Sequence, residues 1–275
     1  MLRARLLTSV FLIPIFLAAL FLLPDILWAL LMLSIIMVGV WEWAEMVKFP
    51  LKARYFYFGI TLTVCLLLTF ASGDDMGNLQ QFSLFWGILG AAVFWIVLAP
   101  IWLISRHKIK NLYVMAVAGW LVILPAWFAL VSLRRVDPWL LLGIIAAVWV
   151  ADTAAYFFGK RFGKHKLAPQ ISPGKTWEGV LGAWVAVSIY GFALCYAFIL
   201  DYWLIAALWG ITVLSIMGDL LESLIKRQGD IKDSGNLLPG HGGVLDRIDG
   251  LTSSLPLAAF FIYFPLYYTA WFHYV

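Results

Sequence analysis

Long apolar stretches separated by short polar segments run along the whole chain. A helix needs about 20 mostly apolar residues to cross roughly 30 Å of hydrocarbon. The pattern predicts nine such helices, at residues 5–23, 26–46, 54–72, 82–104, 112–132, 138–158, 179–198, 203–226 and 250–271. Only Pro24 and Asp25 separate the first two. The predicted fold is an all-α, polytopic membrane domain that covers residues 1–275.

The composition supports this prediction. Hydrophobic residues make up 64% of the chain and charged residues 12%, with a mean hydropathy of +0.93. Soluble domains carry roughly 45–50% apolar and about 25% charged residues. A soluble fold of this length cannot bury so much apolar surface. The first apolar run is too long for a typical signal peptide and has no small-x-small cleavage pattern before Pro24, so we expect it to be retained.

The basic residues indicate the orientation of the chain. Cytoplasmic loops are enriched in Lys and Arg. With a cytoplasmic N-terminus and a periplasmic C-terminus, all 19 basic residues except Arg134 and Arg135 fall on the cytoplasmic side. The two longest polar loops, 159–178 and 227–249, then face the cytoplasm, where nucleotides and Mg²⁺ are found. The charge lies in short loops rather than on a soluble face, so no nucleic-acid partner is expected.

Aromatic and cysteine residues fit the same interpretation. Trp41 and Trp43 at an inner helix end, and Trp271 at an outer end, are interpreted as anchors at the membrane interface. Cys65 and Cys195 lie inside separate apolar runs, which suits neither a disulfide framework nor a metal site.

The end of the eighth predicted helix carries the first candidate chemistry. At 100° per residue, one face collects four polar side chains: Asp219, Glu222, Ser223 and Lys226. Carboxylates near membrane depth are costly and face protein or water rather than lipid. A structural i, i+4 ion pair explains Glu222 and Lys226 but leaves Asp219 unexplained.

The loop that follows mixes acids, bases and glycines. Glycines around His241 leave backbone N–H groups open to an anion. Positive charge comes from Lys226, Arg227, Lys232 and Arg247. Oxygen ligands of the kind that Mg²⁺ prefers come from Asp219, Asp230, Asp233, Asp246 and Asp249. This mixture is typical of a metal–phosphate site, although Asp249 fits equally well as the N-cap of the ninth helix.

The loop 159–178 is the second candidate. Gly174-Lys175-Thr176 is similar to the end of a P-loop, but Pro169 stands where its first glycine should be. No strand is expected before it, so we exclude a P-loop. The glycines and the turn from Ser172 to Lys175 favour phosphate contact. Asp152 lies among small residues inside the sixth helix, either as a functional group or as a polar packing contact.

Residues 223–249 read S-x-I-K-R-x₄-K-D-x-G-x₂-L-P-x-H-G-G-V-x-D-R-I-D, which resembles the phosphatidate cytidylyltransferase signature at every defined position. The resemblance extends to residues 172–177, to Ala151-Asp152 and to the nine-helix layout. It implies that CTP and phosphatidic acid in the inner leaflet give CDP-diacylglycerol and pyrophosphate, with Mg²⁺ as cofactor. It also implies a Gram-negative cell inner membrane. A second cation and a homodimer are left open.

With this family as a guide, each candidate residue receives a role. The expected catalytic residues are Asp219, Lys226, Asp246 and Asp249. Metal binding is assigned to Asp219, Asp246 and Asp249, with Asp152 as a further candidate. The triphosphate or the lipid phosphate is assigned to Lys226, Arg227, Lys232 and Arg247. Further substrate contacts are assigned to Ser172, Lys175, Ser223 and His241.

Two rival functions share some of these features. One is a CTP-dependent transferase that acts on another membrane lipid, such as a polyprenol or an archaeal ether lipid. The other is a secondary transporter that uses Asp152, Asp219 and Glu222 for coupling. Against a transporter, the sequence has no inverted repeat, and its charges cluster at the inner face instead of the midplane.

Overall fold

The computed structural model describes residues 13–70, 85–235 and 242–273, with side chains as far as residue 263. A short helix, Ile13–Leu22, comes first. The longer helices are α2 (Asp25–Met46), α3 (Leu51–Phe70), α6 (Leu112–Val136), α7 (Pro138–Phe162), α8 (Trp177–Phe198), α9 (Trp203–Gln228) and α10 (Leu245–His273). Between α3 and α6, the helical span Phe85–Ser105 contains the π-helical turn η1 (Phe94–Leu98) and ends in α5 (Ala99–Ser105).

In the described part of the chain, seven helices are long and apolar enough to cross a membrane: α2, α3, Phe85–Ser105, α6, α7, α8 and α9. The polytopic, mainly helical membrane fold is therefore confirmed. The predicted first span, 5–23, is described only from Ile13, and the break at Pro24 lies where the sequence placed it. The count of nine spans and the orientation of the termini stay predictions.

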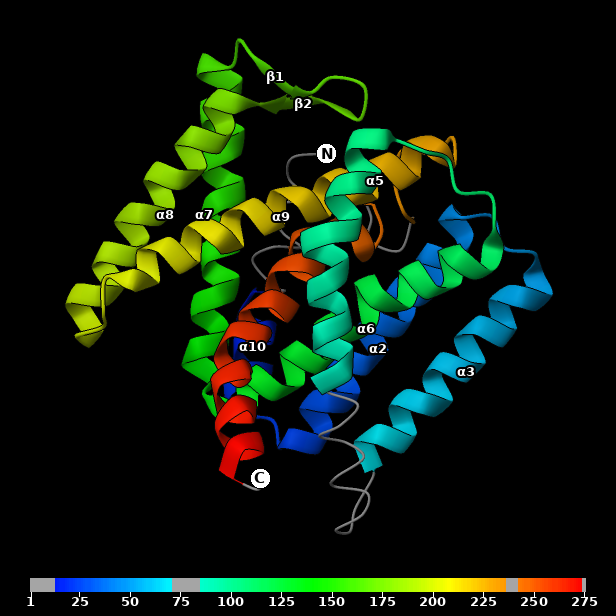
Figure 1. The fold of residues 1–275 in the computed structure, drawn as a ribbon, viewed down its shortest axis with the longest axis horizontal. Coiled ribbons are helices and arrows are strands. Elements are labelled where there is room, and N and C mark those ends of the chain that lie inside the picture. Colours follow the sequence, from blue (N-terminus) through cyan, green and yellow to red (C-terminus); the bar gives the residue numbers. More distant parts are fainter. Residues whose placement is uncertain (1–12, 71–84, 236–241, 274–275) are drawn as a thin grey trace.

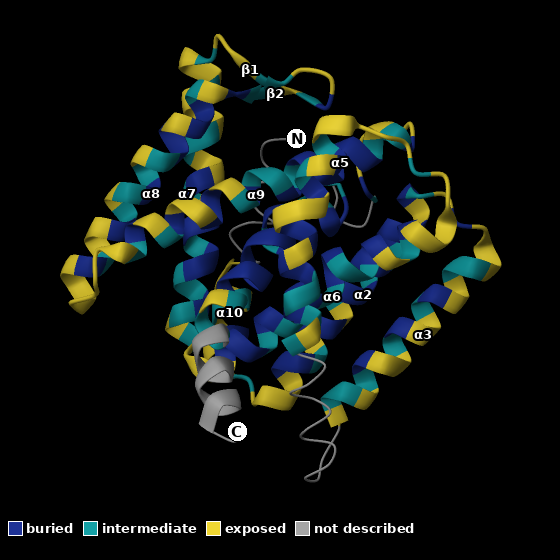
Figure 2. Cartoon of the chain, in the orientation of Figure 1, coloured by how far each residue is buried: buried dark blue, intermediate teal, exposed yellow. Residues whose placement is uncertain are grey.

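The helices form a central bundle with two outer parts (Figure 1). Helices α2, α6 and α10 lie in the middle, and α9 crosses α10. The antiparallel pair α7 and α8 lies on one side, and α3 lies at the opposite edge. Buried positions gather on α2 and α6, whereas α3 and α8 bury fewer of their residues (Figure 2). Exposed apolar side chains on the outer helices suit contact with lipid.

Indole groups connect α2 to α6. Trp28 Nε1 donates to the Leu130 carbonyl at 3.1 Å, and Trp43 Nε1 donates to the Met115 carbonyl at 2.9 Å. Trp43 is only 2% exposed, so its interpretation as an interfacial anchor is wrong. Its N–H donates a hydrogen bond inside the bundle, so the indole can be buried without leaving a polar group unpaired. Gly119 on α6 leaves the room that this indole fills.

Arg134 binds carbonyl groups at the end of the first described helix. Its guanidinium donates to the carbonyls of Leu20, at 2.8 Å, and of Leu23, and it forms an ion pair with Asp25 at 2.7 Å. The side chain is 7% exposed. Carbonyls at a helix end have no partner within the helix. Arg134 supplies the hydrogen-bond donors that these carbonyls beside Pro24 would otherwise lack.

We expect Arg134→Ala to lower the free energy of unfolding by about 2–4 kcal/mol, because it leaves buried carbonyls without a donor. Thermal unfolding of the detergent-solubilised protein measures the loss. The neighbouring Arg135 is exposed, so Arg135→Ala serves as the control and should change stability by less than about 0.5 kcal/mol. Equal losses for the two variants would contradict the role of Arg134.

A β-hairpin connects α7 to α8. Strands β1 (Lys166–Ala168) and β2 (Ser172–Thr176) pair antiparallel, with Lys166 opposite Thr176. The sequence prediction of no strand here is wrong, because a local hairpin forms between the two helix ends. The exclusion of a P-loop still holds, since Gly174–Thr176 lie in a strand rather than in a loop. Thr176 Oγ1 then caps α8 by accepting from Gly179 N at 3.1 Å.

Contacts between polar segments place them at one end of the bundle. Gln228 Nε2 donates to the carbonyls of Arg106 and His107, both at 3.2 Å. Arg106 in turn donates to Gln170 in the hairpin, and Lys48 pairs with Asp230 at 3.5 Å. All four segments are predicted to be cytoplasmic. Their shared position agrees with one common side of the membrane, and which side that is stays a prediction.

Candidate active site

The last two turns of α9 carry a polar face. Ser223 Oγ donates to Asp219 Oδ1 at 3.2 Å, and Lys226 Nζ lies 3.4 Å from Glu222 Oε1. The predicted structural pair of Glu222 and Lys226 is therefore present. The Glu222 oxygens are buried, and within the described residues they accept no hydrogen bond, so this ion pair is their main compensation. A methyl group at Gly218 would lie 2.6 Å from Ser253 Oγ, so α9 and α10 approach closely here.

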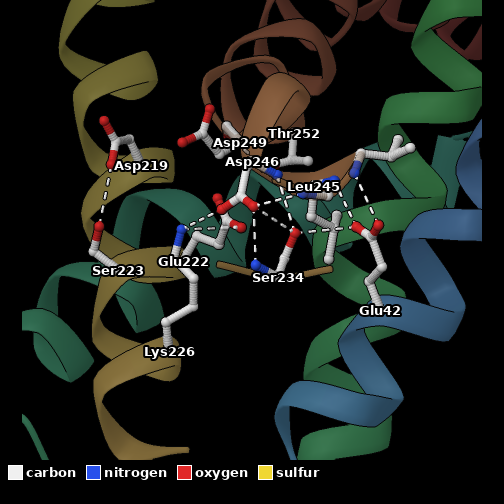
Figure 3. Close-up of polar contacts among 12 residues, drawn as sticks. Glu42, Asp219, Glu222, Ser223, Lys226, Ser234, Leu245, Asp246, Asp249 and Thr252 are labelled. Atoms are coloured by element: carbon white, nitrogen blue, oxygen red, sulfur yellow. Dashed lines mark hydrogen bonds and ion pairs between the residues drawn. The ribbon is translucent and has the colours of Figure 1, made fainter. Parts of the chain in front are cut away.

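Asp246 is the centre of a dense hydrogen-bond network in the first turn of α10 (Figure 3). Its Oδ1 accepts from Lys226 Nζ at 2.5 Å. Its Oδ2 accepts from Gly243 N at 2.8 Å, from Ser234 N at 2.9 Å and from Ser234 Oγ at 3.0 Å. A carboxylate is also favoured at a helix N-terminus. Both oxygens thus accept hydrogen bonds from protein donors, and the residue connects Ser234 and the start of α10 to Lys226 on α9.

A second ion pair joins the two predicted active-site segments. Lys175 Nζ, on β2, lies 2.6 Å from Asp219 Oδ2 on α9. Asp152 on α7 lies nearby, because Ser215 Oγ of α9 donates to it at 3.4 Å and its carboxylate interacts electrostatically with Lys175. Side chains from α7, β2 and α9 therefore meet at one place.

Asp249, on α10, brings a third carboxylate to this place. Because α10 begins at Leu245, Asp249 lies inside the helix, and its interpretation as an N-cap is wrong. The carboxylate accepts from Gly250 N at 2.8 Å and interacts electrostatically with Asp219, Lys175 and Asp152. Of these three carboxylates, from α7, α9 and α10, Asp219 contacts the Lys175 ammonium group directly, and the other two interact with it electrostatically. We call these three, Asp152, Asp219 and Asp249, the acidic cluster.

The acidic cluster has the right chemistry for a hard divalent cation. Over the described ranges, no three His, Cys, Asp or Glu side chains converge tightly enough to form a ready metal site. The cluster nevertheless offers three carboxylates, which interact with the positive charges of Lys175 and, at Asp249, of Lys226. Mg²⁺ is bound by one or two carboxylates together with substrate phosphates rather than by a complete protein cage. The donor set therefore fits a magnesium ion that arrives with a nucleotide.

The other predicted site residues lie outside the acidic cluster. Arg227, Lys232 and Arg247 are exposed near the ends of α9 and α10. Ser172 lies opposite Ala168 in the hairpin. His241 falls outside the described residues.

The sequence reasoning missed Glu42, a buried acid on α2. Its carboxylate accepts from Val244 N at 2.9 Å, from Leu245 N at 2.8 Å and from Ser234 Oγ at 3.1 Å. The side chain is 4% exposed. A signal was available, because an acid within the apolar span 26–46 is costly and so indicates a role.

A sequence model of the cytidylyltransferase family matches residues 3–265, nearly the whole chain. The chain belongs to the cytidylyltransferase family. Two members named phosphatidate cytidylyltransferase are similar over almost their full length. The one from Pseudomonas aeruginosa is 38% identical over 94% of this chain and 96% of its own. The one from Haemophilus influenzae is 35% identical over 97% of this chain and 100% of its own.

A third relative is similar over a shorter stretch. The phosphatidate cytidylyltransferase from Staphylococcus aureus is 49% identical over 116 residues, which make up 40% of this chain and 44% of its own.

Proposed function

We propose that the protein transfers a cytidylyl group from CTP to phosphatidate, giving CDP-diacylglycerol and pyrophosphate at the cytoplasmic face of the inner membrane. The observation that carries this proposal is the similarity to two enzymes of that name over nearly the whole chain. The site agrees with it, because ammonium and carboxylate groups suited to phosphates and a divalent metal meet at one end of a membrane bundle.

The proposed cytidylyl transfer requires little proton transfer. A phosphate oxygen of the lipid attacks the α-phosphorus of CTP, a new P–O bond forms, and the bond to the β-phosphate oxygen breaks. The second pKa of a phosphomonoester is about 6, so the nucleophile is already ionised at neutral pH. No general base is therefore required. The main barrier is the approach of two polyanions, which fixed positive charge and in-line positioning lower.

Each charged group has a place in this scheme. Lys175 and Lys226 bind phosphate oxygens through charge-assisted hydrogen bonds. The exposed Arg227, Lys232 and Arg247 attract the triphosphate towards the site. The acidic cluster would hold Mg²⁺, which when bound neutralises charge on the phosphates and on the leaving pyrophosphate. Asp246 accepts hydrogen bonds from Lys226 and Ser234 and so fixes the position of the lysine, and metal binding by Asp246 stays a prediction.

Labelled CTP tests the proposal directly. The purified protein is incubated in mixed micelles with Mg²⁺, phosphatidate and CTP that carries the label on its α-phosphate. We expect the label to enter the lipid phase with one pyrophosphate released per transfer. The same assay with a polyprenyl phosphate and an archaeal-type ether lipid tests the rival acceptors. Labelling of one of these lipids without labelling of phosphatidate would overturn the proposal.

A further inference from the structure

Glu42 connects α2 to the start of α10 through a buried carboxylate. The first N–H groups of a helix have no partner within the helix. Glu42 accepts hydrogen bonds from two consecutive ones, Val244 N and Leu245 N, with one oxygen for each. Its negative charge also lies at the positive end of the α10 dipole. A buried carboxylate would be costly without such donors, so these contacts are specific.

Contacts from the Glu42 carboxylate also reach the candidate active site. Ser234 Oγ lies 3.1 Å from Glu42 Oε2 and 3.0 Å from Asp246 Oδ2, so this hydroxyl connects the two acids. Asp246 then binds Lys226 Nζ at 2.5 Å. Figure 3 shows the resulting line of contacts from Glu42 on α2 to Lys226 on α9.

Two glycines of the signature segment pack against Glu42. A methyl group at Gly235 would lie 2.6 Å from Glu42 Oε1 and 3.0 Å from its Cδ. A methyl group at Gly243 would lie 2.5 Å from the same oxygen. Of the glycines in the described ranges, only Gly242 has a positive φ. Contact with Glu42, and at position 243 also with Ser234 Oγ, therefore favours glycine at these two positions, rather than a special backbone conformation.

We propose that Glu42 is a positioning residue for cytidylyl transfer: it fixes Ser234 and the start of α10 against α2 and thereby holds Asp246 and Lys226 in place. The catalytic part of this inference rests on the proposed function. The packing part, in which Glu42 excludes side chains from positions 235 and 243, does not.

The first test is Glu42→Gln. The amide keeps one acceptor oxygen but turns an NH₂ group towards a backbone N–H, so at least one hydrogen bond is lost. Misplacement of reacting groups by about 1 Å lowers the rate by about 100-fold, so a partial misplacement should cost about 10- to 100-fold. We expect that loss in kcat per folded enzyme, with a change in KM for CTP of less than about three-fold. A kcat within two-fold of the wild type would overturn the catalytic part.

Glu45→Gln is the matched control, since Glu45 lies one turn along the same helix and its side chain is 54% exposed. We expect its kcat to stay within about two-fold of the wild type, as for other exposed surface changes. Size-exclusion profiles and thermal unfolding of each variant give the folded fraction, which separates a loss of positioning from a loss of protein.

The second test couples Glu42 to Gly235. We expect Gly235→Ala to lower kcat at least about ten-fold in the wild type, and less than about three-fold further in the Glu42→Ala background, where the methyl group has room. Gly210→Ala is the control, because nothing lies within 4 Å of a methyl group at that helical position. Equal losses from Gly235→Ala in both backgrounds would overturn the packing part.

Hydrogen exchange of the wild-type protein tests the same contact without a variant or a substrate. We expect the amides of Val244 and Leu245 to exchange slowly, although both lie at a helix start where N–H groups are usually open. Exchange as fast as in exposed loops would overturn the Glu42 contact. Because this measurement needs no turnover, it stays decisive even if labelled CTP gives no lipid product and the proposed function fails.

Discussion

Replacing Lys226 with methionine should lower kcat/KM for cytidylyl transfer by about 1,000-fold, which corresponds to about 4 kcal/mol. The ammonium group lies 2.5 Å from Asp246 and 3.4 Å from Glu222. Its removal leaves two poorly exposed carboxylates without their cation and takes a positive charge from the proposed phosphate site. Methionine keeps the length and apolar stem of the side chain, so the change isolates the charge.

Initial rates of lipid labelling at several CTP concentrations measure this loss. Lys48→Met is the control, because Lys48 lies at the same end of the bundle but is 64% exposed and pairs only loosely with Asp230. We expect its kcat/KM to stay within about two-fold of the wild type. If Lys226→Met folds normally and retains more than a tenth of the activity, Lys226 has no direct part in phosphate binding.

Asp219→Asn should reduce turnover by a similar factor, about 1,000-fold. Asp219 is the carboxylate that contacts both Lys175, at 2.6 Å, and Ser223, at 3.2 Å. The amide has nearly the same shape but loses the charge that both the lysine and a divalent metal require. We also expect at least about ten-fold weaker Mn²⁺ binding, followed by electron paramagnetic resonance without any turnover.

Asp230→Asn is the control for this variant, since Asp230 is 80% exposed and lies outside the acidic cluster. It should leave both Mn²⁺ affinity and turnover within about two-fold of the wild type. Unchanged Mn²⁺ binding by Asp219→Asn would remove Asp219 from the proposed metal ligands, whatever its effect on turnover.

Much of this site could be predicted from local sequence patterns. Helical periodicity alone placed Asp219, Glu222, Ser223 and Lys226 on one face of α9, and the structure confirms that face. The basic turn in the loop 159–178 was expected to contact substrate, and the structure brings Lys175 from that loop to Asp219. The shared face of α9 is confirmed because it depends only on spacing within one helix, whereas contact between Lys175 and substrate stays a prediction.

What the sequence could not provide depends on contacts between distant elements. Glu42 meets Ser234 across 192 positions of the chain, and no periodicity links them. Trp43 was assigned to the interface because aromatic residues are common there, but the carbonyl of Met115 on α6 accepts its N–H inside the bundle. The start of α10 was predicted five residues too late, because the acceptor that caps it, the Glu42 carboxylate, comes from α2 and not from its own flanking sequence.

The central claim is that β2 and the end of α9 form one catalytic site, and a double-mutant cycle of Lys175→Gln and Asp219→Asn tests it most directly. Initial rates of lipid labelling are compared for the wild type, both single variants and the double variant. Residues that act as a unit lose their function together. We expect the double variant to be about as slow as the slower single variant. Losses that instead multiply, so that the double variant is slower by the product of both factors, would show two independent contributions and contradict the claim.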